Sequence, residues 1–401
     1  MFFFVLPAKK SSFPFDSPID FFQELKYNLI KPLTQVLTFM ESSEKRKTVS
    51  LTDIARQSGF SVATVSKVLN NARGSNVSSE KRDHILKIAS ELNYRPNRTA
   101  KFLECGKTGQ TAFIIPHEFF SNYAWRASAS LTMQVYDGAV QELARNRYMT
   151  NLIFSPEDNV CDFLRRALLA ERTVDGVLID AGEEELSMAK EFEAMGIPVA
   201  SFDWRSPRHH VSHVQEAPEE GIREAVEQLK HLGHRSAGCF YYYDDLRAHH
   251  TTLRTDIFIQ SCRDAGIHVL SGFVSSYRDE TDSYIQTLNL FSGKTEMPTI
   301  LFYPSDHSAM MGMRALLNLG FSIPEEISIV GYDDAPYNIN APGPLATIRI
   351  SREQMGREGA KLLMERILEP EIQNVRSVRI HTEFIPRTSV GPSGNKKKQQ
   401  A

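Results

Sequence analysis

The segment SVATVSKVLN, from Ser61 to Asn70, combines small side chains, hydroxyl groups and one lysine in a single short stretch. Val62 and Ala63 are of a size to contact a thymine methyl group, and Lys67 can reach a guanine edge or a phosphate. Hydroxyl and amide groups mostly bind phosphates, which positions a helix without reading the base sequence. In this stretch those groups belong to Ser61, Thr64, Ser66 and Asn70. The alternative is an ordinary helical hairpin that caps a domain.

A second set of polar residues follows predicted strands. Asp203 comes after PVASF, Asp306 after TILFYPS and Asp333 after ISIVGY. Ligands of open parallel sheets bind at the carboxyl ends of strands, where carboxylates can accept hydrogen bonds from the hydroxyls of a sugar. Trp125 and Trp204 offer flat faces for stacking on such a ligand. Each residue also has a structural alternative, since an Asp at a strand end often caps a helix and a Trp often packs at an interface.

Other chemistries are not supported by the motifs. The four cysteines are far apart, which fits a reducing compartment. The clustered histidines form no metal-binding helix pattern and are expected to be solvated loop residues; they are His209, His210, His213, His231, His234, His249 and His250. The sequence has no phosphate-binding loop, dinucleotide-binding or nucleophile-elbow motif. We therefore expect no metal, no cofactor and no enzymatic activity, although acidic residues in a cleft leave glycoside hydrolysis as an alternative to test.

Residues 48–94 are predicted to form three short helices that position the Ser61–Asn70 segment. Ser50 and Asp53 make a capping box for the first helix, Gly59 ends it, and Ser61 caps the second. Ser78 or Ser79 caps the third. Two helices joined by a glycine turn are typical of a helix-turn-helix, in which the second helix enters the major groove.

From Thr111 onward, short apolar runs alternate with amphipathic stretches. The apolar runs are TAFIIP, MTNLIF, DGVLID, PVASFD, SAGCFYY, TILFYP and ISIVGYD, and the expected helices are 130–147, 159–172, 184–195, 219–232, 251–265 and 308–319. This alternation predicts an α/β fold with parallel strands. So many strands favour two sheets with a cleft between them.

The charge of the chain is unevenly distributed. The 401 residues carry a net charge of -3, but residues 45–107 carry +8 and the remainder therefore -11. A basic module on an acidic body indicates that one part binds a polyanion. Neither a membrane span nor a secretory signal is predicted, so we expect a cytoplasmic protein.

Several segments together resemble the lactose/galactose repressor (LacI/GalR) family of bacterial transcription regulators, over residues 48–388. They are TVSLTDIARQSGFSVATVSKVLN, VSSEKRDHILKIASELNYRPNRTAKFL, VDGVLI, GIPVASFD, LGHR and IPEEISIVGYDD…PLATIRISREQMGREGAKLL. The resemblance implies a homodimer that binds a pseudo-palindromic double-stranded DNA operator. It also implies a body shared in part with periplasmic sugar-binding proteins.

The resemblance further implies a hinge helix that folds on the operator and enters the minor groove, with Leu103 wedged into the central base step and Ala100 packed beside it. Arg254 matches a family arginine that grips the effector. Two features depart from the family pattern, namely the long loop NARGSN and the carboxylate of Glu104 after the wedge leucine.

Five segments are therefore predicted. Residues 1–45 are an N-terminal extension, in which residues 1–39 are expected to be poorly ordered or to precede a true start at Met40. Residues 46–95 are a helix-turn-helix DNA-binding head. Residues 96–109 are the hinge helix and linker, 110–390 are an effector-binding and dimerisation body of two subdomains, and 391–401 are a disordered tail. The predicted function is a regulator, expected to be a repressor, whose operator affinity depends on a sugar-like effector. The alternative is a periplasmic-type sugar-binding protein without a DNA function.

Overall fold

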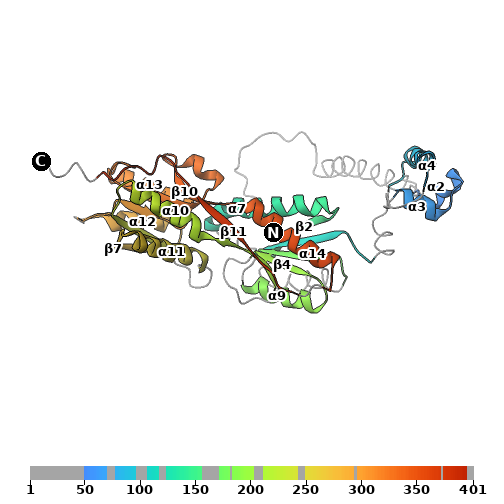
Figure 1. Cartoon of the computed structure of the whole chain (residues 1–401), viewed down its shortest axis with the longest axis horizontal. Coiled ribbons are helices and arrows are strands. Elements are labelled where there is room, and N and C mark those ends of the chain that lie inside the picture. Colours follow the sequence, from blue (N-terminus) through green and yellow to red (C-terminus); the bar gives the residue numbers. More distant parts are fainter. Residues whose placement is uncertain are drawn as a thin grey trace, which may run out of the picture. The chain divides into compact units, whose positions relative to one another are not determined.

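The computed structural model describes residues 49–69, 77–95, 106–116, 123–155, 171–180, 183–202, 211–242, 249–292, 296–371 and 374–394. Within these ranges the side chains of residues 116, 123–129, 155, 183–188, 249–252, 280, 337 and 339 are left out. The chain divides into two compact units, residues 1–97 and 98–401. We refer to these units as the head and the body (Figure 1).

The head contains the three predicted helices, α2 (Leu51–Ser58), α3 (Val62–Leu69) and α4 (Ser79–Glu91). The predicted capping box at the start of α2 is present: the Ser50 side chain accepts from the backbone of Asp53, and the Asp53 side chain accepts from the backbone of Ser50. Gly59 ends α2 with φ 74°, a left-handed conformation that glycine adopts without a steric penalty. Ser78 stands at the N-cap of α4 but makes no side-chain capping bond.

The head core is built from the apolar face of each helix. Ile54 of α2, Val65 of α3 and Ile85 of α4 are fully buried and belong to one hydrophobic cluster. Because this cluster takes one side of α3, the opposite side of that helix is left at the surface. The short helices are therefore held by packing rather than by their own length.

The body is built on one continuous run of eleven paired strands. The strands are β1 (Gln110–Pro116), β2 (Met149–Ser155), β3 (Gly176–Asp180), β4 (Val199–Phe202), β5 (Ser212–Ala217), β6 (Ser236–Tyr242), β7 (His268–Tyr277), β8 (Ile300–Phe302), β9 (Ser328–Asp333), β10 (Ala346–Ile350) and β11 (Ser377–Ile385). Their order is β2-β1-β3-β4-β5-β11-β10-β9-β8-β6-β7. The expected α/β fold with mostly parallel strands is confirmed.

The expectation of two separate sheets needs correction, because β11 belongs to both halves of the run. Residues 377–381 pair parallel with β5, and residues 382–385 pair antiparallel with β10. Figure 1 shows β11 as the long strand near the middle of the body. We call β1–β5 with their helices the first half of the body and β6–β10 with their helices the second half.

Helices cover the strands of both halves. They are α7 (Tyr123–Arg145), α9 (Glu183–Ala194), α10 (Pro218–His231), α11 (His249–Ala265), α12 (Glu280–Phe291), α13 (Asp306–Asn318) and α14 (Arg352–Leu368), with a short 3-10 helix η2 (Pro336–Asn340). The C-terminal α14 returns to the first half, where it packs on α7 and on β3, β4 and β5. The predicted alternation omitted β5, β7, α12, β10, α14 and β11. The expected helix 159–172 falls almost entirely outside the described residues.

No helix among the described residues is long and apolar enough to cross a membrane.

Candidate functional site

The outward face of α3 carries the residues predicted to contact DNA. The Ser61 hydroxyl caps the helix by accepting a hydrogen bond from the Thr64 backbone at 3.2 Å. Val65 and Val68 point into the head core, whereas Val62 leaves 42% of its surface exposed. The side chains at the surface are Ser61, Val62, Ala63 and Lys67, and those that are half-buried are Thr64 and Ser66. An exposed, small-residue face that begins at a helix N-terminus has the shape required for close approach to a base edge.

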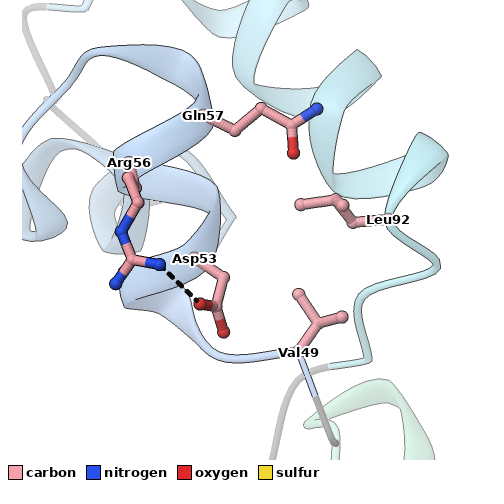
Figure 2. A pocket seen from close by; sticks show the side chains of 5 residues that line it. All are labelled: Val49, Asp53, Arg56, Gln57 and Leu92. Carbon is pink, nitrogen blue, oxygen red and sulfur yellow. Dashed lines mark ion pairs between the residues drawn. The ribbon is translucent and has the colours of Figure 1, made fainter.

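Figure 2 shows a pocket in the head, between the start of α2 and the end of α4. It has a volume of about 360 Å³ and is lined by Val49, Asp53, Arg56, Gln57 and Leu92. The Asp53 carboxylate is used by the capping box, and it lies 3.7 Å from the exposed Arg56 guanidinium. The Asp53 carboxylate is therefore engaged by the start of α2.

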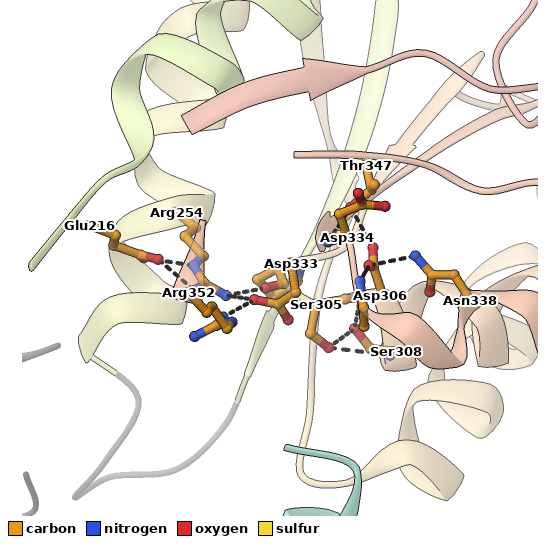
Figure 3. A network of polar contacts seen from close by, with 12 residues as sticks. Glu216, Arg254, Ser305, Asp306, Ser308, Asp333, Asp334, Asn338, Thr347 and Arg352 are labelled. Carbon is orange, nitrogen blue, oxygen red and sulfur yellow. Dashed lines mark hydrogen bonds and ion pairs between the residues drawn. The ribbon is translucent and has the colours of Figure 1, made fainter. Parts of the chain in front are cut away.

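The body contains a buried network of two acids and two arginines, which Figure 3 shows. Arg254 donates from Nε and Nη2 to the two carboxylate oxygens of Glu216, each at 2.8 Å. Its Nη1 lies 3.4 Å from Asp333, which also accepts from Arg352 Nη2 at 2.6 Å. No side chain of the four is more than 6% exposed. We call these four residues the bridging network.

The bridging network connects the two halves of the body. Glu216 lies in β5 and Arg352 begins α14, so both belong to the first half. Arg254 lies in α11, which packs on β6 and β7, and Asp333 ends β9, so both belong to the second half. Each half therefore supplies one acid and one arginine.

Burial and charge act against each other in this network. Burial alone would lower the pKa of Arg254, but the attraction of Glu216 and Asp333 raises that pKa above its usual range. Burial raises the pKa of Asp333, and the two arginines oppose the change. The Arg254 guanidinium also lies over the ring of Tyr332, 3.7 Å from the ring centroid, an arrangement that favours the cationic form.

Asp333 has an unusual backbone. Its φ is 113°, and that of the following Asp334 is 50°. Residues other than glycine rarely adopt this backbone region. Such strain persists only where the surrounding structure holds it, and it is found most often at functional positions. Here the Arg352 and Arg254 contacts hold Asp333, and the Asp334 carboxylate accepts from Arg349 Nε at 2.6 Å.

Asp306 is placed differently from the expectation of an open ligand contact. It is fully buried, and its oxygens accept from the Ala335 backbone at 2.8 Å, Asn338 Nδ2 at 2.7 Å and Thr347 Oγ1 at 2.6 Å. Burial and the nearby Asp333 raise the pKa of Asp306 to about 8. These contacts hold the segment after β9, so Asp306 supports the position of Asp333 (Figure 3).

Arg254 also differs from the expectation of a guanidinium open to an effector, because Nε, Nη1 and Nη2 all have partners in the chain. Besides Glu216 and Asp333, the Pro304 carbonyl accepts from Nη1 at 2.9 Å. Asp306, Asp333 and Arg254 are brought together. Asp203, Trp204, Asn70, Ala100 and Leu103, as well as the side chain of Trp125, lie outside the described residues.

Glu216, Arg352, Asn338 and Thr347 were missed in the sequence. Glu216 gave the clearest signal of the four. It lies in SHVQEA, a strand that is mostly buried, and a charged residue in such a strand needs a partner. Arg352 follows Ser351, which caps α14 and so marks a helix start.

Two histidines contradict the expectation of solvated loop residues. His213 is 5% exposed and contacts the Val211 carbonyl at 3.1 Å. His234 is 1% exposed and contacts Thr299 Oγ1 and the Gly391 carbonyl, each at 2.9 Å. Within the described residues, no group of three or more His, Cys, Asp or Glu side chains is arranged to hold a metal ion.

Comparisons with known proteins agree with this arrangement. The family model for bacterial regulatory proteins of the lacI family matches residues 50–97, and the model for a periplasmic binding protein-like domain matches residues 226–390. Together they span more than half of the chain. The HTH-type transcriptional repressor PurR of Photobacterium profundum is 26% identical over 350 residues, covering 85% of this chain and 98% of the relative. PurR of Vibrio vulnificus is 27% identical over 351 residues, with the same coverage.

Solved structures share the fold. The lac repressor dimer bound to operator and the anti-inducer ONPF is 23% identical with a TM-score of 0.67, covering 86% of this chain and 100% of that one. A complex of the regulator CelR with cellobiose is 23% identical with a TM-score of 0.58, covering 85% and 99%. A LacI-family regulator from Enterococcus faecium with bound ribose is 22% identical with a TM-score of 0.56, covering 70% and 99%.

A helix-turn-helix head joined to a periplasmic-binding-protein-like body defines a class of ligand-responsive DNA-binding proteins. The chain belongs to the LacI family of bacterial regulatory proteins. It is a DNA-binding transcription regulator with an effector-binding body, and not an enzyme.

Proposed function

We propose that the protein represses transcription as a homodimer, by binding a pseudo-palindromic operator whose affinity depends on a small effector held between the two halves of the body. The observation that carries the DNA-binding part is the surface of α3, where Ser61, Val62, Ala63 and Lys67 lie on the side away from the buried Val65. In this proposal Val62 and Ala63 contact base edges, while Lys67 contacts a guanine edge or a phosphate.

The remaining DNA contacts follow from the same placement. The hydroxyls of Thr64 and Ser66, together with Asn70, satisfy phosphates. By the family resemblance, Ala100 and Leu103 enter the minor groove at the operator centre. The protein then acts in the cytoplasm on the nucleoid, with residues 46–95 as the head, 96–109 as the hinge and 110–390 as the body. We assign no contact with DNA or effector to residues 1–45 and 391–401.

For the effector, we propose a site beside the bridging network, because both halves of the body meet there. Asp333 and Arg254 shape this site, Asp306 supports them, and Asp203, Trp125 and Trp204 complete it. A ligand that binds the two halves in one arrangement better than in another changes the free-energy difference between the arrangements. Carbohydrates are the first candidates, since solved structures of this fold hold cellobiose and ribose.

The test is a selection of bound duplexes from a random library with the full chain, followed by binding titrations on the selected DNA. We expect an enriched site with two related half-sites. Each compound from a thermal-shift screen of sugars, sugar acids and nucleosides is then added to the titration. A compound that lowers DNA affinity is an inducer, and one that raises it is a corepressor. Absence of any enriched sequence would refute the regulator and favour a sugar-binding protein without a DNA role.

A further inference from the structure

The Arg254 guanidinium is engaged by its own chain on its edge and on one face. The Glu216 carboxylate takes Nε and Nη2, the Pro304 carbonyl and Asp333 take Nη1, and the Tyr332 ring covers a face. The side chain retains 2% of its surface exposure. An effector that approaches the bridging network therefore meets an arginine whose strongest interactions are already made.

The geometry of the Glu216–Arg254 pair is that of a bound acid. Two parallel N–H···O bonds between a guanidinium and a carboxylate are the arrangement by which arginine recognises a carboxylate or a phosphate. Glu216 comes from β5 of the first half and Arg254 from α11 of the second half. The carboxylate of Glu216 thus occupies the position that an acidic ligand between the halves would take.

The buried charges around this point leave no excess of positive charge. In the ranges that the structure describes, no lysine is buried, and the buried arginines are Arg254 and Arg352. Glu216 and Asp333 balance them one for one, and the remaining buried acid nearby is Asp306. An anion that displaced Glu216 would leave a carboxylate buried without its cation, which is among the most unfavourable changes in a protein interior.

We infer that Glu216 is a specificity-determining residue, which occupies Arg254 as a ligand carboxylate would and restricts the body to effectors that carry no negative charge at this arginine. The expected ligand class is an uncharged small molecule with hydrogen-bonding groups. This inference rests on the proposed function for the role of the site. The geometry on which it depends is that Glu216 fills the carboxylate-binding position of Arg254.

The first experiment removes the internal carboxylate and supplies one from solution. Thermal unfolding of the full chain with Glu216→Ala is followed by circular dichroism in sodium acetate and in sodium chloride at equal ionic strength. We expect acetate to raise the Tm of this variant by about 2–4 °C relative to chloride, and to leave the wild type unchanged. Formate, the smaller acid, is expected to act in the same direction.

A matched control separates this effect from a general effect of the salt. Arg366 and Glu193 also form a two-bond pair, but their side chains are 17% and 26% exposed. Glu193 lies in α9, and Arg366 lies in the last turn of α14, at the opposite end of that helix from Arg352. Glu193→Ala is therefore expected to show a smaller difference between acetate and chloride than Glu216→Ala. Equal responses of the two variants, or no response of Glu216→Ala, would overturn the inference.

A second variant serves if Glu216→Ala does not fold. Glu216→Gln keeps the shape of the side chain and removes its charge, so Arg254 and Arg352 then face only the carboxylate of Asp333 and carry one positive charge in excess. Glucose is compared with glucuronate, and ribose with ribose 5-phosphate, in binding titrations of the wild type and this variant. We expect the preference for the anion over its neutral partner to rise at least about tenfold in Glu216→Gln, since a tenfold change corresponds to about 1.4 kcal/mol.

Two results of these titrations would contradict the inference. One is a wild type that binds an anion tighter than its neutral counterpart, and the other is a variant that gains no anion binding. The duplex selection is read separately. A chain that selects no DNA would refute the proposed regulator, while the acetate result would still report on the Arg254 subsite.

Discussion

Replacement of Glu216 by glutamine is expected to destabilise the body strongly, because Arg254 then keeps its charge in a buried position without its main carboxylate partner. Breaking a buried ion pair by removing one partner costs about 3–5 kcal/mol. The lower end applies here, since Arg254 retains Asp333 at 3.4 Å and the Pro304 carbonyl at 2.9 Å. At about 2–4 °C for each kcal/mol, a loss of about 3 kcal/mol lowers the Tm by roughly 6–12 °C.

The assay is a double-mutant cycle by thermal unfolding of the full chain. Glu216→Gln, Arg254→Met and the double variant are compared with the wild type. The apolar methionine fits over the Tyr332 ring, and Asp333 keeps its 2.6 Å bond from Arg352. The double variant is therefore expected to be more stable than the sum of the single losses predicts, by about 1–3 kcal/mol.

The control is an exposed pair on the same body. Arg376 and Glu365 have side chains that are 53% and 43% exposed, so Glu365→Gln is expected to cost less than about 1 kcal/mol. If Glu216→Gln cost no more than this control, or if the two losses in the cycle added without coupling, Arg254 and Glu216 would not form the buried pair on which the reasoning depends.

Three further changes test other parts of the molecule. Lys67→Ala is expected to weaken operator binding and to reduce its dependence on salt if Lys67 contacts a phosphate. Lys87→Ala on α4 serves as the control. An unchanged affinity of Lys67→Ala for the operator would show that Lys67 is not part of the DNA interface. Gly331→Ala is expected to cost about 1–3 kcal/mol of unfolding free energy, because an added Cβ collides with the Asp306 carboxylate, while Gly343→Ala, whose nearest atom would be 4.0 Å away, is expected to be near neutral. Because the pKa of Asp306 is raised from 3.8 to about 8, the folded state holds this proton longer than the unfolded state, so stability falls as the pH rises between those values. Asp306→Asn is expected to flatten that fall, and an unchanged pH profile would place its origin elsewhere.

The effector proposal requires that the two halves of the body are connected and that a ligand can change their relative arrangement. The linkage is the shared strand β11 together with the bridging network, in which each half supplies one acid and one arginine. A ligand beside this network changes the environment of buried charges whose pairing spans the halves. In this proposal the bridging network is the structural element through which effector binding changes the affinity for the operator.

The site was only partly predictable from sequence. Asp306, Asp333 and Arg254 were selected because they follow strands or match a family motif, and the structure does place them together. What the sequence did not indicate is that Glu216 fills the fork of Arg254 and that Thr347 binds Asp306. These partners lie 38 and 41 residues apart in the chain. No local pattern records such a pairing, because it depends on which strands and helices become neighbours.

The sequence by itself determined the head and the class of the body. The features that define the head are local, so they can be recognised from the sequence alone. They are a capping box, the glycine at φ 74° and the spacing of Val65 and Val68. The tertiary structure alone decided that β11 joins the two halves and that Glu216 of the same chain pairs with Arg254. Both outcomes are set by the burial of segments far apart in the chain, and burial is the condition that makes a charge require its partner.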